Sequence, residues 1–385
     1  MHPLRSVSLL ALLVGSASAV AQNQAIQLST GVDGGVAYAF DARMVPATGI
    51  TVEAVITYND STVPTGLNYW PTIARQNITP NQESWNFRVS AGNNGTRNLN
   101  FIVRASNNAL YSASYFFAVG EFTTATHVAA TYDGQVIRLF KNGSQVALYT
   151  TPLLSEVQDN GGVMRIGNGD PVAPGHESWN GTIDEVRIWP MARTAAEIAA
   201  SAGQELNGMT GGVLVFPMNG NHDSSDGTVV GAPFGTVAFT AGSTLTPVAP
   251  LLFPLATPSS TCAQKPGILV GSAPQVGNTA FQFWCVRGPR PVNSPAGAVF
   301  AGASPAPPTQ PIVLGLDIAF DLTTLLASVV LAPPTDALGN ARFALPIPNQ
   351  PNLVGVSFVF QFAFFDSQCG PQGLTASDGL LFAIQ

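Results

Sequence analysis

Charged residues are scarce in this sequence. They make up 10% of its 385 residues, and Lys141 and Lys265 are the only lysines. Long amphipathic helices need a charged face, so this composition argues against a mainly helical protein. The net charge is −7. Nucleic acid and anionic lipid are both bound by clusters of basic side chains, so we expect neither as a partner.

Cysteine is also scarce, and its three examples, Cys262, Cys285 and Cys369, all lie in the last third of the chain. None of them forms a C-x-x-C pair, which argues against a cysteine metal site. In an oxidising compartment, three cysteines are expected to give one disulfide and one free thiol. The sequence leaves all three possible pairings open.

Long apolar runs are missing. The N-terminal run Ser8–Val14 is too short to cross a bilayer, but Arg5 precedes it and Ala19-Val20-Ala21 follows it. This pattern predicts a signal peptide over residues 1–21, and the alternative is a buried N-terminal strand or helix. We therefore expect a secreted or cell-surface protein that is not inserted in a membrane after cleavage.

Common catalytic motifs are missing as well. The sequence has no G-x-S-x-G turn, no H-E-x-x-H zinc motif and no strand with the alternating carboxylates of glucanases. The histidines after the signal, His127, His176 and His222, are too scattered for an evident triad. We expect His127 to be structural, and we predict that the protein is not an enzyme.

Short strands joined by turns are what the sequence does contain. Gly49–Tyr58 alternates apolar and polar residues, which is the pattern of a half-buried strand. His127–Tyr149 reads as three strands separated by Asp133-Gly134 and Asn142-Gly143, dipeptides that favour tight hairpin turns. The fold class is therefore predicted to be all-β and antiparallel.

One helix is predicted after Trp189. Thr194 can cap its N-terminus and Glu197, three residues later, can return the hydrogen bond, as in a capping box. We expect about two turns at the periphery of the fold.

Composition divides the chain into two domains. Residues 22–245 carry most of the strand patterns, and residues 246–261 form a Pro/Thr/Ser-rich linker. Residues 262–385 are very apolar and are interrupted by Pro and Gly, as in a second, smaller β-sandwich.

Two segments carry a family resemblance. His127–Leu148 (HVAATYDGQVIRLFKNGSQVAL) and Trp179–Trp189 (WNGTIDEVRIW) resemble the signature strands of the LamG-like jellyroll family, within the concanavalin A-like lectin/glucanase superfamily. Gly31-Val32-Asp33 resembles the family's opening strand, although Gly34 and Gly35 replace its usual Asp and Tyr. The resemblance covers about residues 22–205 and implies an antiparallel jellyroll β-sandwich.

A weaker resemblance concerns the C-terminal domain. Gly339–Gly355, Phe360-Gln361 and Asp378-Gly379-Leu380 resemble a module at the ends of secreted bacterial proteins. This implies a fold for the second domain and no function.

The LamG-like resemblance also implies a structural calcium ion. Its ligands would be the Asp184 carboxylate and backbone carbonyls near Asp33, although the change at Gly34 removes one family ligand. Calcium accepts such a mixture of oxygen ligands. Alternatively, Asp184 pairs with Arg187 or caps a neighbouring turn.

Ligand binding is assigned to loops at the rim of the jellyroll. Trp70 and Trp179 lie in loop-like sequence and could stack on sugar rings, or they could be core residues. We expect a secreted, non-catalytic protein that binds a glycan or a cell-surface protein. The alternatives are a structural or adhesive protein of the cell envelope and a divergent glycoside hydrolase that uses Glu177 or Glu185.

Overall fold

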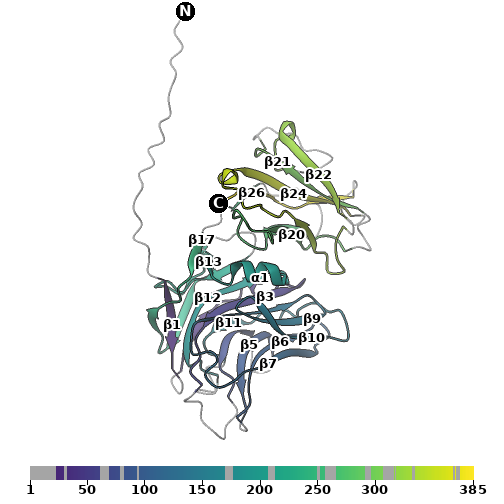
Figure 1. Ribbon diagram of the computed structural model, residues 1–385. Coiled ribbons are helices and arrows are strands. Elements are labelled where there is room, and N and C mark those ends of the chain that lie inside the picture. The colour runs from purple at the N-terminus through teal and green to yellow at the C-terminus, as the bar shows by residue number, and fades with distance from the viewer. Residues whose placement is uncertain are drawn as a thin grey trace, which may run out of the picture.

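The structure of the protein is a computed structural model (Figure 1). It describes residues 23–29, 33–60, 69–78, 82–92, 95–169, 177–206, 213–248, 252–255, 266–290, 296–306, 316, 318–331, 334–366, 369 and 373–385. The predicted signal peptide, His176 and Cys262 lie outside the described residues.

Two antiparallel sheets are stacked in the first domain (Figure 1). The first, here called the junction sheet, has the strand order β10-β9-β8-β3-β12-β1-β16, with β14 paired to β12. Its strands are β1 (Gln24–Leu28), β3 (Ile50–Ile56), β8 (Thr126–Tyr132), β9 (Val136–Lys141), β10 (Ser144–Thr150), β12 (Gly181–Trp189), β14 (Leu214–Phe216) and β16 (Ala238–Ala241).

The second sheet, here called the outer sheet, has the order β15-β2-β11-β4-β5-β6-β7. Its strands are β2 (Gly34–Tyr38), β4 (Thr72–Asn77), β5 (Glu83–Ala91), β6 (Arg97–Arg104), β7 (Leu110–Phe116), β11 (Val163–Ile166) and β15 (Gly231–Gly235). A short 3-10 turn, η1 (Ala42–Met44), follows β2. Apolar side chains from both sheets fill the space between them, among them Trp85, Phe87 and Phe101 from the outer sheet and Val52 and Ile56 from the junction sheet.

The predicted hairpins are confirmed. β8, β9 and β10 pair as an antiparallel meander. Gly134, Asn142 and Gly143 take φ values of 93°, 47° and 79° in the two turns. Glycine and asparagine tolerate this left-handed conformation better than other residues, which explains why these dipeptides mark the turns.

The helix α1 (Ala195–Ser201) has the predicted capping box, in which Thr194 and Glu197 exchange hydrogen bonds. Its predicted peripheral position is wrong. Glu197 and Ile198 are fully buried, because the helix lies between the junction sheet and the second domain (Figure 1). Within the described residues, no helix is long and apolar enough to cross a membrane.

The second domain contains two further antiparallel sheets. One has the order β18-β26-β24-β21-β22 with β25 paired to β24, and the other has the order β19-β20-β23. Their strands are β18 (Leu252–Leu255), β19 (Gly267–Val270), β20 (Gln282–Val286), β21 (Gly297–Gly302), β22 (Leu325–Leu331), β23 (Ala341–Ala344), β24 (Ser357–Phe365), β25 (Leu374–Ala376) and β26 (Gly379–Ala383), with 3-10 turns η2 (Leu322–Thr324) and η3 (Pro351–Leu353). Phenylalanine rings form the centre, where Phe283 and Phe360 stack with ring centroids 4.2 Å apart.

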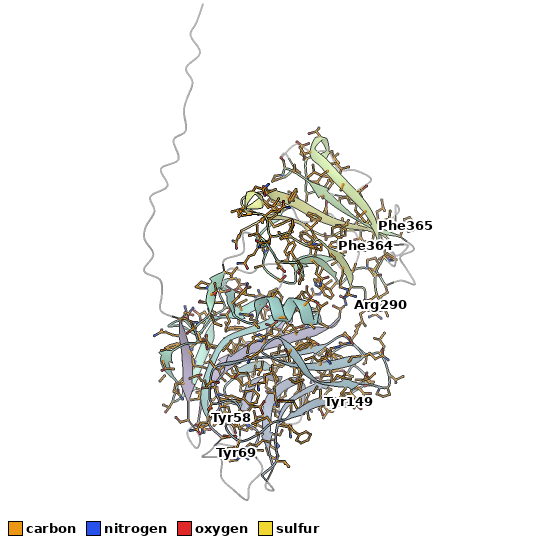
Figure 2. All side chains as sticks on the ribbon, in the orientation of Figure 1. Tyr58, Tyr69, Tyr149, Arg290, Phe364 and Phe365 are labelled. Atoms are coloured by element: carbon orange, nitrogen blue, oxygen red, sulfur yellow. The ribbon has the colours of Figure 1, made fainter. Side chains whose placement is uncertain are left out.

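The two domains share one apolar cluster. Trp189 and Val215, on the outward side of the junction sheet, belong to the same buried cluster as Phe283 and Phe382 of the second domain. Arg290 of the second domain also forms an ion pair with Glu156 of the first, and it lies where the two domains meet (Figure 2).

The segment predicted as a linker carries two short strands. β17 (Thr246–Val248) pairs in parallel with β13 (Gln204–Leu206), which follows α1. β18 pairs with β26 of the second domain. Val248 thus belongs to a strand paired within the first domain, and Leu252 begins a strand paired within the second.

Candidate functional site

The outward side of the outer sheet is unusually polar. Along β5, Trp85, Phe87 and Val89 point into the core, so the residues between them, Asn86 and Arg88, point outward. Strand register places outward residues of neighbouring strands in two rows. One row is Arg165, Arg75 and Asn86, and the other is Thr72, Arg88 and Asn100.

The term polar face is used below for these six residues and for four residues at their margin, Trp70, Glu83, Arg104 and Glu177. Arg75 is its most enclosed cation. Its Nη1 donates to Glu177 Oε2 at 2.7 Å, and its Nη2 lies 3.7 Å from Glu83 Oε2. Arg165 Nη1 donates to Asn77 Oδ1 at 2.9 Å, and Arg104 Nε donates to the Glu83 carbonyl at 3.1 Å. Three of the four arginines on this face are thus held by acceptors of the protein itself.

Arg88 differs from these three. Among the described residues it has no ion-pair partner, and its Nε has no hydrogen-bond acceptor. Its guanidinium lies 5.9 Å from the centre of the Trp70 ring, within the range of a cation–π contact. Burial lowers the pKa of the Arg88 guanidinium. A partly buried cation without an anion is unfavourable, so this position is suited to an anionic ligand.

The two predicted ligand-binding tryptophans occupy different environments. Trp70, which precedes β4, is 36% exposed. Trp179 is fully buried, its Nε1 donates to the Thr57 carbonyl at 3.0 Å, and its ring packs on Tyr58 at 4.8 Å. Of the two alternatives left open for Trp179, core packing is the one that its burial supports. Tyr69, beside Trp70, lies at the end of the jellyroll that points away from the second domain (Figure 2).

Asp184 lies on the outward side of the junction sheet. It opposes Val55 of β3, just before a β-bulge in which Glu185 has a left-handed φ of 49°. Its Oδ2 accepts a hydrogen bond from Ser243 N at 3.1 Å, while its Oδ1 has no partner. Burial raises the pKa of Asp184 to about 7. The predicted pair with Arg187 is absent from the ion pairs of the described residues, because Arg187 binds Glu53 and Glu185.

A second oxygen without a partner lies near Asp184. Asn23 Oδ1 is buried and accepts no hydrogen bond. A methyl group added at Gly242 would stand 2.6 Å from Asn23 Oδ1 and 2.9 Å from Asp184 Oδ2. Asn23 Oδ1 and Asp184 Oδ2, the second of which also accepts from Ser243 N, therefore both lie beside Gly242, and hard oxygen atoms of this kind suit calcium. Within the described residues, no group of three His, Cys, Asp or Glu side chains could hold a metal.

Asp33, the other residue predicted near the calcium, is elsewhere. Asn23 precedes β1, whereas Asp33 follows it and leads into β2 of the outer sheet. Asp33 Oδ1 lies 3.5 Å from Asn168 Nδ2, and its carbonyl accepts from Thr236 N. The structure thus places Asp33 and Asp184 at opposite ends of β1.

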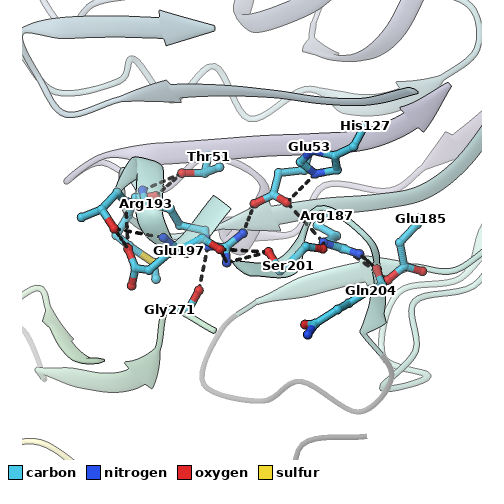
Figure 3. Close-up of polar contacts among 12 residues, drawn as sticks. Thr51, Glu53, His127, Glu185, Arg187, Arg193, Glu197, Ser201, Gln204 and Gly271 are labelled. Carbon is cyan, nitrogen blue, oxygen red and sulfur yellow. Dashed lines mark hydrogen bonds and ion pairs between the residues drawn. The ribbon is translucent and has the colours of Figure 1, made fainter. Parts of the chain in front are cut away.

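A buried ionic network lies at the domain junction (Figure 3). Glu53 of β3 is fully buried and forms ion pairs with Arg193 and with Arg187 Nη1, the latter at 3.3 Å. His127 Nε2 lies 3.1 Å from the same carboxylate. Arg193 continues to the second domain by donating to the Gly271 carbonyl at 2.8 Å. His127 is therefore a buried structural histidine, as predicted, held by Glu53 through Nε2, while its buried Nδ1 has no hydrogen-bond partner among the described residues.

The two glutamates of the hydrolase alternative lie on different sheets. Glu177 pairs with Arg75 on the outer sheet. Glu185 is on the junction sheet, where it accepts from Leu206 N at 2.6 Å and from Arg187 Nε at 3.2 Å. The two carboxylates cannot flank one glycosidic bond.

Two groups of residues at these sites were not predicted from the sequence. Arg88 and Asn86 could have been found, because they alternate with the apolar residues of WNFRV. Glu53 could not, because its partners at positions 127, 187 and 193 are distant in the sequence.

Two stacked antiparallel sheets around an apolar core define the first domain as a jellyroll sandwich. Residues 22–199 match the family model described as the Concanavalin A-like lectin/glucanases superfamily. The predicted fold class and the LamG-like resemblance are confirmed.

Several solved structures are similar to this chain. A candidate carbohydrate binding protein from Bacteroides ovatus is 16% identical with a TM-score of 0.43, over 58% of this chain and 61% of that protein. A SAP-like pentraxin from Limulus polyphemus is 16% identical with a TM-score of 0.42, over 58% of this chain and 98% of the pentraxin. CBM40 of a Ruminococcus gnavus IT-sialidase is 17% identical with a TM-score of 0.34, over 46% of this chain and 98% of CBM40. No curated protein sequence matches the chain.

Proposed function

We propose that the protein is a non-catalytic, carbohydrate-binding protein and that the polar face of the outer sheet is its binding surface. One observation carries this proposal: an exposed tryptophan, Trp70, adjoins a row of outward polar side chains that includes Arg88 and Asn100. A sugar presents an apolar C–H face and a ring of hydroxyl groups. Trp70 would stack on the C–H face, and the Arg88 guanidinium would hydrogen-bond to the hydroxyl groups.

A binding role fits the carboxylates of the polar face better than catalysis. Glu83 and Glu177 are both within ion-pair distance of Arg75, at 3.7 and 2.7 Å. A glycosidase needs one protonated carboxyl group as its general acid. Two carboxylates engaged by the same guanidinium are poorly placed for that role.

Binding to a panel of soluble polysaccharides tests this proposal. We expect at least one polysaccharide to bind, and Trp70→Ala to weaken that binding by about two- to tenfold, since an aromatic stacking contact contributes about 0.5–1.5 kcal/mol. Tyr149→Ala is the matched control, because Tyr149 is a 41% exposed ring on β10 of the other sheet (Figure 2). Absence of binding to every polysaccharide, or equal loss in both variants, would contradict the proposal.

We also propose that a structural calcium ion binds beside Gly242, held by Asp184 and by Asn23 instead of Asp33. The partnerless Oδ1 atoms of Asp184 and Asn23 support it. Calcium that binds only the folded state should raise the melting temperature, by an amount equivalent to about 2.7 kcal/mol at 100 times the Kd. We expect Asp184→Asn to abolish this rise and Asp33→Asn to leave it unchanged. An unchanged melting temperature of the wild-type protein with and without calcium would remove the calcium proposal.

We propose, finally, that the chain is exported and cleaved before Gln22, on the basis of the N-terminal sequence. N-terminal sequencing of the protein recovered from its native host should begin at Gln22. Fractionation separates the two roles considered above, because a protein of the cell envelope would stay with the envelope and a secreted one would enter the medium. An intact Met1 on all of the recovered protein would contradict export by this route.

A further inference from the structure

The charge on the polar face is opposite in sign to that of the whole chain. Arg75, Arg88, Arg104 and Arg165 lie on this face with Glu83 and Glu177. Four cations and two anions leave an excess of two positive charges, whereas the whole chain has a net charge of −7. Four of the 15 lysines and arginines of the chain lie on this side of the outer sheet.

Among the described residues, Arg88 is the one arginine of this face for which no acceptor is found. Arg75 is held by Glu177 and Glu83, Arg104 by the Glu83 carbonyl, and Arg165 by Asn77. Arg88 lies one row away from Arg75 and, within the described residues, its contact is with the Trp70 ring. The row neighbour Asn100 uses its amide group to donate to the Ala113 carbonyl and to Ser114 Oγ. Among the described residues, no carboxylate forms an ion pair with Arg88, and Glu83 and Glu177, which pair with Arg75, act on it only as nearby charges.

We propose that the glycan bound by the polar face carries carboxylate groups, and that Arg88 selects it by pairing with one of them while the sugar ring stacks on Trp70. The inference rests on the proposed function and adds its ligand class. A guanidinium presents two parallel N–H donors that match the two oxygens of a carboxylate. A neutral sugar would leave the Arg88 cation without a counter-charge, so a uronic acid is preferred.

Calorimetric titration of the full chain with oligogalacturonate and with its methyl ester tests the proposal. The two probes share a ring and a linkage and differ in charge. We expect the free acid to bind at least about tenfold more tightly, since a hydrogen bond to a charged group contributes about 1.5–3 kcal/mol. Added salt should weaken the binding of the free acid and leave the binding of the ester unchanged.

Arg88→Gln should weaken the binding of the free acid alone. The affinities for the acid and the ester should then lie within about twofold of each other. Arg88→Lys, which keeps the charge but not the paired donors, should keep part of the preference. Arg138→Gln is the matched control, because Arg138 is a partly exposed arginine on the junction sheet, paired with Asp133. Circular dichroism melting checks that each variant is folded.

Each result points to one conclusion. Equal binding of acid and ester by the wild type, or equal weakening of both in Arg88→Gln, would overturn the ligand class while leaving carbohydrate binding in place. Equal loss of the acid preference in Arg138→Gln would also overturn it, because a general charge effect would then explain the preference. Failure of every charged and neutral polysaccharide to bind would instead defeat the proposed function.

Discussion

Glu53 is the most constrained charged residue of the junction. It is fully buried, and both of its oxygens are engaged, Oε1 by the Arg193 cation and Oε2 by the Arg187 cation and the His127 imidazole. Burial alone would raise the pKa of Glu53, but Arg193, His127 and Arg187 lower it well below its ordinary value. The carboxylate is therefore ionised, and its removal would leave two buried guanidinium groups without their anion.

Replacing Glu53 should accordingly be costly. We expect Glu53→Gln to lower the free energy of unfolding by about 3–5 kcal/mol, as is usual when one member of a buried ion pair is removed. Urea denaturation measures this loss. Glu156→Gln is the control, since Glu156 pairs with Arg290 at a site where Arg290 is 53% exposed, and it should cost less than about 1 kcal/mol. Equal effects of the two variants would contradict the importance given to burial.

His127 makes stability depend on pH. Burial lowers the pKa of its imidazole, against the hydrogen bond with Glu53, and the nearby Arg187 and Arg193 act in the same direction as burial. The pKa of His127 in the unfolded chain is about 6.5, which is higher than in the folded protein. Below that pH, the unfolded chain therefore binds a proton at His127 more readily than the folded protein does. The contribution of His127 to stability should therefore fall as the pH drops below about 6.5, by up to about 1.4 kcal/mol per pH unit. Asp184, whose pKa is raised to about 7, acts in the opposite direction over the same range. Melting curves of the wild type and of His127→Gln from pH 8 to 5 should therefore differ by the His127 contribution, and identical pH profiles would contradict it.

At the scale of elements, β22 is an exposed apolar edge. It pairs with β21 and ends its sheet, and Leu325, Leu326 and Val330 are 45%, 55% and 76% exposed. An apolar edge strand offers unpaired backbone groups to a second chain. We expect the protein to self-associate at high concentration, and Val330→Lys to reduce this. Light scattering measures it, with Val119→Lys as the control at a similarly exposed residue in a turn.

At the scale of the whole molecule, the two domains are joined by more than a linker. Glu197 of α1 accepts a hydrogen bond from Trp284 Nε1 at 2.7 Å, and Arg193 donates to the Gly271 carbonyl. Together with the shared apolar cluster, these contacts couple the first domain to the second. The pair should unfold as one cooperative unit.

Calorimetry of the wild type should thus show a single transition. Gly271→Ala should lower the midpoint of this transition or split it into two, because a Cβ at this position would collide with the Glu197 carboxyl group. Gly203→Ala is the control, since no atom lies within 4 Å of the Cβ it would add. Two separate transitions in the wild type would show that the junction contacts are too weak to couple the domains.

The cysteines make a second prediction about the whole molecule. Cys285 is free and fully buried, and burial raises the pKa of its thiol well above the ordinary value. This leaves Cys262 and Cys369 as the predicted disulfide. Thiol titration of the oxidised protein should therefore find no reactive thiol in the native state and one in urea. After reduction it should find three in urea, and three without reduction would disprove the disulfide.

The amino-acid sequence by itself determined the features that depend on near neighbours. Period-two alternation indicated the strands, Asp133-Gly134 and Asn142-Gly143 placed two hairpins, and Thr194 with Glu197 placed the helix. Each of these follows from backbone preferences within a few residues, so the all-β class was predictable. The jellyroll itself was indicated by the resemblance of the signature strands to a known family, and not by these local preferences.

Only the tertiary structure decided which of the loop tryptophans is exposed and which is buried. It also brought together Glu53, His127 and Arg187 from three strands, and it set Arg88 beside Trp70 without an anion. The position of α1 between the domains belongs to the same group. The physical reason is that burial and charge pairing depend on contacts between residues far apart in the chain, and no local pattern encodes which distant side chain will cover a given position.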